Sequence, residues 1–228
     1  MSLASYALLH RECFTLFDEE MFADLFTDVG RRSIPPTVVA VVMVLQRIEG
    51  LSDREAVDRF CFHELRTTWF PAVPGLVERL EAGVRVADVG CGHGGGPPNV
   101  SFLVGDATEP FSVEYDVVVY FDALHDMGDP ASALREAYAS LCQGGIVLAI
   151  EPWSTDRLED GIGNPLVQLD YALSTSVCTP CALAQQGRHA LGNQGGPTPR
   201  LELLTAAGFR DPIVAADTGF NLVLAATK

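Results

Sequence analysis

The chain has 228 residues, of which 48% are hydrophobic, and a formal net charge of −15 at pH 7. This length allows one α/β domain with a small appendage, and the apolar content is sufficient to fill a core. No apolar run approaches the roughly 18 residues that a membrane span needs, and the first residues lack a signal peptide's basic start, so we expect a cytoplasmic protein without a membrane partner.

Acidic residues outnumber basic ones in both parts of the chain. Residues 1–70 contain 7 Arg and 11 Asp/Glu, a net charge of −4, and residues 71–228 contain 8 Lys/Arg and 19 Asp/Glu, a net charge of −11. Release of counterions from nucleic-acid phosphates requires clustered Lys and Arg. The charge distribution therefore disfavours a nucleic-acid partner.

The cysteines are scattered along a chain that is too long to need disulfide bonds for stability, so we expect reduced thiols. They are Cys13, Cys61, Cys91, Cys142, Cys178 and Cys181. Only the last two are close in sequence. A single C-x-x-C pair favours two packed thiols at the start of a helix over a metal site, and we predict no metal centre.

The first seventy residues have the pattern of helices. Asp18 is placed to cap a helix over residues 19–26, and an apolar run over residues 38–48 follows two prolines. Ser52 and Glu55 form a capping box for a third helix. Residues 15–65 resemble the N-terminal helical domain of insertion-sequence transposases, most specifically in "LQRIEGLSDREAVDRF". No acidic triad of a transposase nuclease follows, so transposase activity is not implied.

From residue 71 the pattern changes to short Val-rich strands that alternate with helices, which predicts an α/β domain over residues 71–228 after a helical domain over residues 1–70. We expect strands at residues 85–89, 100–104, 115–121, 146–150, 213–216 and 221–225. We expect helices at residues 77–81, 130–141, 165–178, 181–191 and 200–207. This order predicts a mainly parallel sheet that ends in an antiparallel edge strand.

A glycine-rich turn follows the first predicted strand of the α/β domain. The segment "VADVGCGHG" places Asp88, Gly90, Gly92 and Gly94 in the pattern D-x-G-x-G-x-G. Glycine lets a backbone turn sharply and approach a ligand without a Cβ in the way, and ligands of open α/β sheets bind at the carboxyl ends of strands. A purely structural turn uses the same residues, so the motif alone leaves both interpretations open.

Further segments occur in a familiar order: "GDAT" from Gly105, "FDALHDMGDP" from Phe121, "LCQGG" before a strand, and a final "AAGF". With the glycine-rich turn, they resemble the Rossmann-like class I S-adenosylmethionine-dependent methyltransferases over about residues 72–228. The resemblance implies S-adenosylmethionine as cofactor and a small-molecule methyl acceptor.

Carried over by position, the resemblance implies that Asp88 and the backbone from Gly90 through Gly92 to Gly94 hold the methionine end of the cofactor. Asp106 and Ala107 would contact adenine, and Asp122 would lie near the reacting sulfonium. Asp106 has a structural alternative, because an Asp that closes a strand often only caps a turn.

His125 and Asp126 lie in the "FDALHDMGDP" loop. A histidine beside a carboxylate can accept a proton near neutral pH, so these two residues are the candidate catalytic pair. Sequence neighbours need not face each other, and a hydrogen-bonded structural histidine is the alternative interpretation.

The pattern of the family is broken after the glycine-rich turn. Only five residues, "GGPPN", separate Gly94 from Val100, whereas a parallel crossover needs a dozen or more. The crossover, its strand and the carboxylate that would bind the ribose have no equivalent, so we expect fewer than seven strands and weak cofactor binding. The uncovered sheet edge would pair with the N-terminal helices or with a second copy in a homo-oligomer.

These observations leave three hypotheses for function. The first is a small-molecule methyltransferase impaired by the missing segment. The second is a non-catalytic fusion or assembly module in which the transposase-like helices make contacts with DNA or protein. The third is a non-functional product of an insertion and a deletion. Binding of S-adenosylmethionine discriminates the first from the others.

Overall fold

The computed structural model describes residues 64–91 and 99–228. Contacts divide the chain into two units, Met1–Phe70 and Pro71–Lys228. The described part of the first unit is one short helix, η2 (Leu65–Trp69), and the start of α4 (Phe70–Ala72). The helices expected before residue 64 lie outside the described residues. Among the described residues no helix is both long enough and apolar enough to cross a bilayer.

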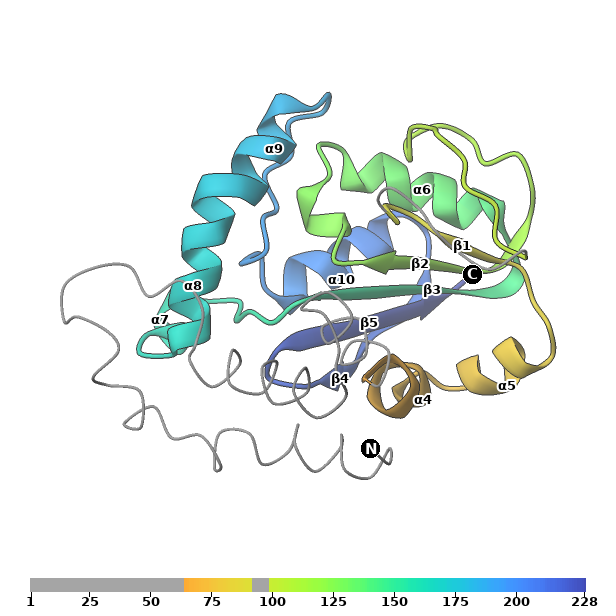
Figure 1. Ribbon diagram of the computed structural model, residues 1–228, viewed down its shortest axis with the longest axis horizontal. Helices are drawn as coiled ribbons and strands as arrows, with labels where there is room; N and C mark the ends of the chain where they lie inside the picture. The colour runs from red at the N-terminus through yellow and green to blue at the C-terminus, as the bar shows by residue number, and fades with distance from the viewer. Residues whose placement is uncertain (1–63, 92–98) are drawn as a thin grey trace, which may run out of the picture. The chain divides into compact units, whose positions relative to one another are not determined.

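The second unit is built on one mixed five-stranded sheet, which confirms the predicted Rossmann-like α/β class (Figure 1). The strands are β1 (Val86–Asp88), β2 (Tyr115–Phe121), β3 (Leu141–Pro152), β4 (Arg210–Asp217) and β5 (Asn221–Thr227). Their spatial order is β1-β2-β3-β5-β4, and the first three strands are parallel. The carboxyl ends of β1, β2 and β3 therefore meet at one edge of the sheet.

The position of the antiparallel strand differs from the prediction of an antiparallel edge. β5 is antiparallel to both of its neighbours and lies between β3 and β4, so β4 forms the edge and runs in the same direction as β1–β3. A tight turn joins the last two strands, where the N–H of Gly219 donates to Oδ1 of Asp217 (2.9 Å). The hairpin returns β5 into the space beside β3, where its apolar residues are buried on both faces.

The strand expected at residues 100–104 is wrong, because the structure gives these residues no strand pairing. Their apolar side chains are exposed instead, and that of Leu103 is 78% exposed. β propensity reflects how well a side chain packs on a pleated surface, and a strand needs a partner to form hydrogen bonds. The connection after Gly94 is too short for a parallel crossover, so it cannot bring residues 100–104 beside another strand.

Helices flank the sheet, and three of them begin with a proline. They are α5 (Leu76–Glu81), α6 (Pro130–Ser140), α7 (Leu158–Gly161), α8 (Pro165–Leu173), η4 (Ser174–Cys178), α9 (Thr179–Ala184) and α10 (Pro197–Ala206). The helix expected at residues 181–191 ends early, because the side chain of Gln185 bonds the amide of Gly128 (2.9 Å) and the carbonyl of Asp126 (2.8 Å). These bonds draw the chain toward the loop after β2.

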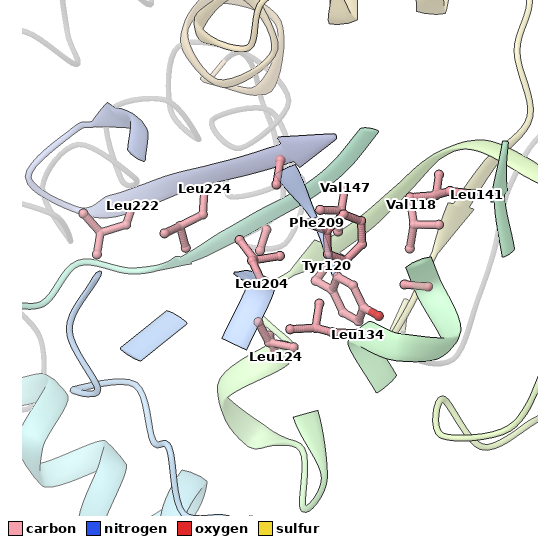
Figure 2. Packing of buried hydrophobic residues seen from close by; sticks show 13 residues of the cluster. Val118, Tyr120, Leu124, Leu134, Leu141, Val147, Leu204, Phe209, Leu222 and Leu224 are labelled. Carbon is pink, nitrogen blue, oxygen red and sulfur yellow. The ribbon is translucent and has the colours of Figure 1, made fainter. Parts of the chain in front are cut away.

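One layer of the core lies between the sheet and helices α6 and α10 (Figure 2). Alternate residues of β2, β3 and β5 point into it, and Leu134 and Leu204 enter from the two helices. Tyr120 is fully buried there, and its hydroxyl donates to the carbonyl oxygen of Ala133 (3.1 Å). Burial raises the pKa of this hydroxyl far above its ordinary value. The layer fixes the ends of β2 and β3, from which the candidate site is built.

Candidate active site

The loop after β2 brings the candidate catalytic residues to the carboxyl edge of the sheet. Asp122 directly follows the strand with a positive φ of 52°, a conformation that turns the chain sharply away from the strand direction. Its N–H donates to the carbonyl oxygen of Ile150 in β3 (2.8 Å). A short 3-10 helix, η3 (Leu124–Asp126), then carries His125 inward, where only 3% of its surface is exposed.

Glu151 holds the ring of His125. It lies near the end of β3, is fully buried, and its Oε2 is 2.7 Å from Nδ1 of His125. The same carboxylate accepts the N–H of Leu124 (2.9 Å) and the N–H of His125 (3.3 Å). Because a carboxylate only accepts, Nδ1 carries the proton and Nε2 is the nitrogen that can take another.

The pKa of His125 is raised above its ordinary value. Burial opposes the charged ring, but the hydrogen bond and the charge of Glu151, together with the nearby charges of Asp126 and Asp122, outweigh it. The protonated ring is therefore stabilised by the carboxylates that surround it. This is the electrostatic setting of a group that accepts a proton near neutral pH.

Asp126 does face its sequence neighbour, since its Oδ1 lies 3.3 Å from Nε2 of His125. That oxygen is buried and has no hydrogen-bond partner of acceptable geometry. With Sγ of Cys178, the two side chains offer three ligand atoms within 4.8 Å of one another, a spacing that one metal ion could bridge. Burial raises the pKa of the Cys178 thiol to about 12, so a metal ion would have to displace a proton from it on binding.

Arg200 of α10 is the buried cation of the site, with none of its surface exposed. Its Nη1 donates to Oγ of Ser154 (2.9 Å) and to the carbonyl oxygen of Gly196 (2.7 Å), and its Nη2 donates to the carbonyl oxygen of Asn193 (3.0 Å). Its Nε lies 3.8 Å from Oε2 of Glu151. Arg200 thus balances the buried carboxylate that orients His125.

Our sequence analysis did not identify Glu151 or Arg200. A signal existed for Glu151, because a charged residue at the end of the buried run "IVLAIE" is rarely placed there without a partner. No comparable signal marks Arg200, which precedes a leucine-rich helical segment like any exposed helix residue.

Two of the predicted cofactor residues, Asp88 and Gly90, lie at the end of β1, next to the loop after β2. Asp88 ends β1, and desolvation raises the pKa of its carboxyl group. Gly90 has a φ of 89°, and a Cβ there would lie 2.7 Å from Cβ of Ala123. The glycine-rich turn therefore packs closely against the loop that carries His125. Gly92 and Gly94 lie outside the described residues.

The carboxylate of Asp106 is engaged locally. It accepts the N–H of Thr108 (2.9 Å) and the hydroxyl of the same residue (2.8 Å), and these bonds lower the pKa of Asp106. Neither Asp106 nor Ala107 is joined by a hydrogen bond or an ion pair to Asp88 or Asp122 within the described residues. Their role at the adenine of a cofactor stays a prediction.

A pocket of about 220 Å³ lies beside Asp122, at the ends of β2 and β3. Its lining comes from the loop after β2, the end of β3, helix α8 and the β4–β5 turn. The lining residues are Asp122, Pro152, Trp153, Leu166, Asp170, Gly219, Phe220 and Asn221. The pocket, the buried histidine and the glycine-rich turn thus share one edge of the sheet.

Two family models match different segments of the chain. Residues 91–149 match a methyltransferase domain, and residues 8–71 match a transposase domain (DUF772). The chain thus carries a segment similar to a transposase domain, followed by a segment similar to a methyltransferase domain. The methyltransferase match includes Asp122, His125 and Asp126, whereas Asp88, Glu151 and Arg200 lie outside it.

The fold of the chain is similar to that of a solved methyltransferase. Human N-acetylserotonin methyltransferase in complex with SAM is 22% identical with a TM-score of 0.50, and the match covers 82% of this chain and 59% of that one. PigF with SAH is 21% identical with a TM-score of 0.40, and the match covers 54% of this chain and 34% of that one. The chain therefore spans about a third to three fifths of these proteins. No curated protein matches the chain.

Proposed function

We propose that this protein is an S-adenosylmethionine-dependent methyltransferase that acts on a small molecule, with residues 1–70 and 71–228 as its two domains. The observation that carries the proposal is the geometry of His125. Its Nδ1 is fixed by the buried Glu151, its Nε2 lies 3.3 Å from Oδ1 of Asp126, and Asp122 of the same loop lines a pocket at the carboxyl edge of the sheet. The methyltransferase match over the same loop supports this assignment.

In the proposed reaction, His125 acts as the general base. The nucleophilic group of the acceptor gives its proton to Nε2, and its lone pair forms the bond to the methyl carbon. Glu151 stabilises the imidazolium that results, and Asp126 lies 3.3 Å from the newly protonated nitrogen. When bound, S-adenosylmethionine supplies the methyl group on a positively charged sulfur, which keeps the electron pair of the broken bond. Alignment of the acceptor with the methyl carbon supplies much of the rate, so few further catalytic side chains are needed.

The residues present fit the methionine end of this cofactor better than its ribose. Asp122 and Asp88 offer carboxylates at adjacent strand ends, which suits a cationic sulfonium and ammonium. Gly90, with Gly92 and Gly94, would hold the methionine end, and Asp106 and Ala107 would meet the adenine. The carboxylate that would bind the ribose has no counterpart in the sequence. A hydrogen bond to a charged group is worth about 1.5 to 3 kcal/mol, so this loss weakens binding on the order of a hundredfold.

The test is calorimetric titration of the intact chain with S-adenosylmethionine and with S-adenosylhomocysteine, continued to high ligand concentration. We expect weak binding that Asp88→Ala abolishes and that His125→Ala leaves nearly unchanged. In a methyl-transfer assay, His125→Ala should lower the rate constant without changing the cofactor affinity. Cofactor binding that survives Asp88→Ala would contradict the site.

The transposase match over residues 8–71 supports a second candidate function, that of an assembly module attached to a methyltransferase scaffold. The net charge of −4 over residues 1–70 argues against strong DNA binding by that part. A mobility-shift assay of the intact chain at physiological salt separates the two ideas. Sequence-specific retention of DNA, together with no cofactor binding, would favour the assembly module.

A further inference from the structure

The pocket beside Asp122 combines acidic and aromatic side chains. Two of its eight lining residues are aspartates, Asp122 and Asp170, and two are the aromatic residues Trp153 and Phe220. None of the eight is basic. A cavity of about 220 Å³ with this lining suits a small ligand that carries a positive charge and an apolar body.

The carboxylate of Asp170 pairs with no cation in the described part of the chain, although the charge of His125 acts on it. Among residues 64–91 and 99–228, it makes no side-chain hydrogen bond and no ion pair. Desolvation, and then the charge of Asp122, raise the pKa of Asp170 to about 6, so the group is mostly ionised above neutral pH. A partly buried carboxylate that faces a second carboxylate is costly unless something positive joins them.

The neighbouring cations are already engaged elsewhere. Arg200 is fully buried and its guanidinium bonds Ser154, Gly196 and Asn193. His125 is held by Glu151. Five carboxylates act on these two cations, namely Asp122, Asp126, Glu151, Asp156 and Asp170. Negative charge is therefore in excess here, and two of the five carboxylates line the pocket: Asp170 and Asp122, whose Oδ1 lies 4.0 Å from Nδ1 of His125.

We propose that this pocket binds an ammonium group of the methyl acceptor, so that the substrate class is a small amine with an aromatic or apolar body. One part of the inference rests on the proposed function, namely that the ligand of this pocket is the methyl acceptor. Asp170 and Asp122 pair with the ammonium, and Trp153 and Phe220 cover the body of the ligand and attract its charge through their ring faces.

The ammonium of the cofactor itself is not the ligand of this pocket. The predicted methionine end lies at the glycine-rich turn after β1, and β1 is the edge strand on the far side of β2. The pocket instead extends from β2 toward β3, α8 and the start of β5. Asp122 is the residue that the two regions share, which places the proposed amine next to the expected position of the sulfonium.

The experiment compares tyramine with 4-propylphenol, in which a methyl group replaces the ammonium while the ring, the hydroxyl group and the chain length are kept. Each is titrated into the full chain by calorimetry slightly above neutral pH, where Asp170 is ionised. We expect tyramine to bind about tenfold more tightly, because an ion pair in a partly desolvated site adds to the attraction of the aromatic rings. Asp170→Asn should reduce that preference, since it keeps the size of the side chain and removes one of the two charges.

Asp160→Asn is the matched control, because Asp160 lies exposed in α7 and outside the pocket. It should leave the preference for tyramine intact. Equal affinity of the unchanged protein for the two ligands, the absence of binding by tyramine, or a preference as large in Asp170→Asn as in the unchanged protein would each overturn the inference.

The cofactor titration keeps this test separate from that of the proposed function. Asp170→Asn should bind S-adenosylhomocysteine as the unchanged protein does, because Asp170 lies on the acceptor side. Tyramine binding without any cofactor binding would retain the ammonium pocket and refute the methyltransferase. Cofactor binding together with equal affinity for tyramine and 4-propylphenol would retain the methyltransferase and refute the ammonium pocket.

Discussion

Replacement of Glu151 by glutamine tests how the site orients its base. The carboxylate accepts three N–H donors, from the backbone of Leu124, the backbone of His125 and Nδ1 of the His125 ring. A glutamine has one accepting oxygen and an NH₂ group that can only donate. If the NH₂ group takes the place of Oε2, it can bond the ring only if Nδ1 gives up its proton. The proton then moves to Nε2, and the ring loses its accepting nitrogen.

The expected loss of stability is about 3 kcal/mol, because a hydrogen bond to a charged group is lost and Arg200 is left in the core without its counter-ion. The loss depends on pH with a definite sign. Glu151 helps to raise the pKa of His125 in the folded protein. The stabilisation that this gives is fully present below the unfolded histidine pKa of about 6.5 and disappears as the pH rises through the folded value.

Urea unfolding of both proteins, at about pH 6 and at about pH 8.5, measures this difference. The free energies of unfolding should differ more at the acidic pH than at the alkaline one. Glu159→Gln is the control, because Glu159 is exposed and, within residues 64–91 and 99–228, pairs only with the exposed Arg157 (3.5 Å), so the change should cost less than about 1 kcal/mol. Equal unfolding of Glu151→Gln and the unchanged protein at both pH values would refute the assigned role of Glu151.

Two further predictions concern the surroundings of the site. Gly90→Ala should destabilise the protein by about 2 to 4 kcal/mol, and Gly163→Ala by only about 1, because both glycines have a φ of 89° but only at Gly90 does a Cβ meet another atom, 2.7 Å from Ala123. Chemical denaturation compares the two. In alkylation by iodoacetamide followed by mass spectrometry, Cys181 should react well before Cys178, since Cys181 is exposed and the pKa of the buried Cys178 is raised to about 12.

The sequence predicts a strand correctly where the folded chain gives that strand a neighbouring strand to pair with. The bounds of β2 are those expected, residues 115–121, and the start of α6 at Pro130 follows from its proline and its cap. The segment at residues 100–104 has the composition of a strand but does not form one. Composition does not show whether a second strand lies close enough to pair with it. The absence of the crossover, which the sequence also shows, leaves this segment without a neighbouring strand.

The candidate site was predictable only in part for a related reason. His125 and Asp126 stand together in one loop, so a local motif identifies them. Glu151 and Arg200, which fix and balance that histidine, come from β3 and α10 and meet it only in the folded chain. Local patterns can name a reactive residue, whereas the groups that orient it depend on long-range packing.

The base and the cofactor site rest on different elements, and this separation has a kinetic consequence. His125 is held by Glu151 of β3, which Arg200 of α10 balances, and both residues follow the shortened segment in the chain. The missing crossover belongs to the cofactor side, after β1. Its loss should therefore raise the cofactor concentration needed for half-maximal rate and leave the orientation of the base unchanged.

Steady-state methyl transfer to an aromatic amine, measured over a wide range of S-adenosylmethionine, tests this separation. We expect a rate that keeps rising far beyond the concentrations that saturate complete methyltransferases, and that falls in Glu151→Gln without any shift in the cofactor concentration required. A rate that saturates early at a very low value would show instead that the deletion has disturbed the proton-accepting half of the site. In that case the orientation of His125 would depend on the β1 side as well, through the close packing of Gly90 on Ala123.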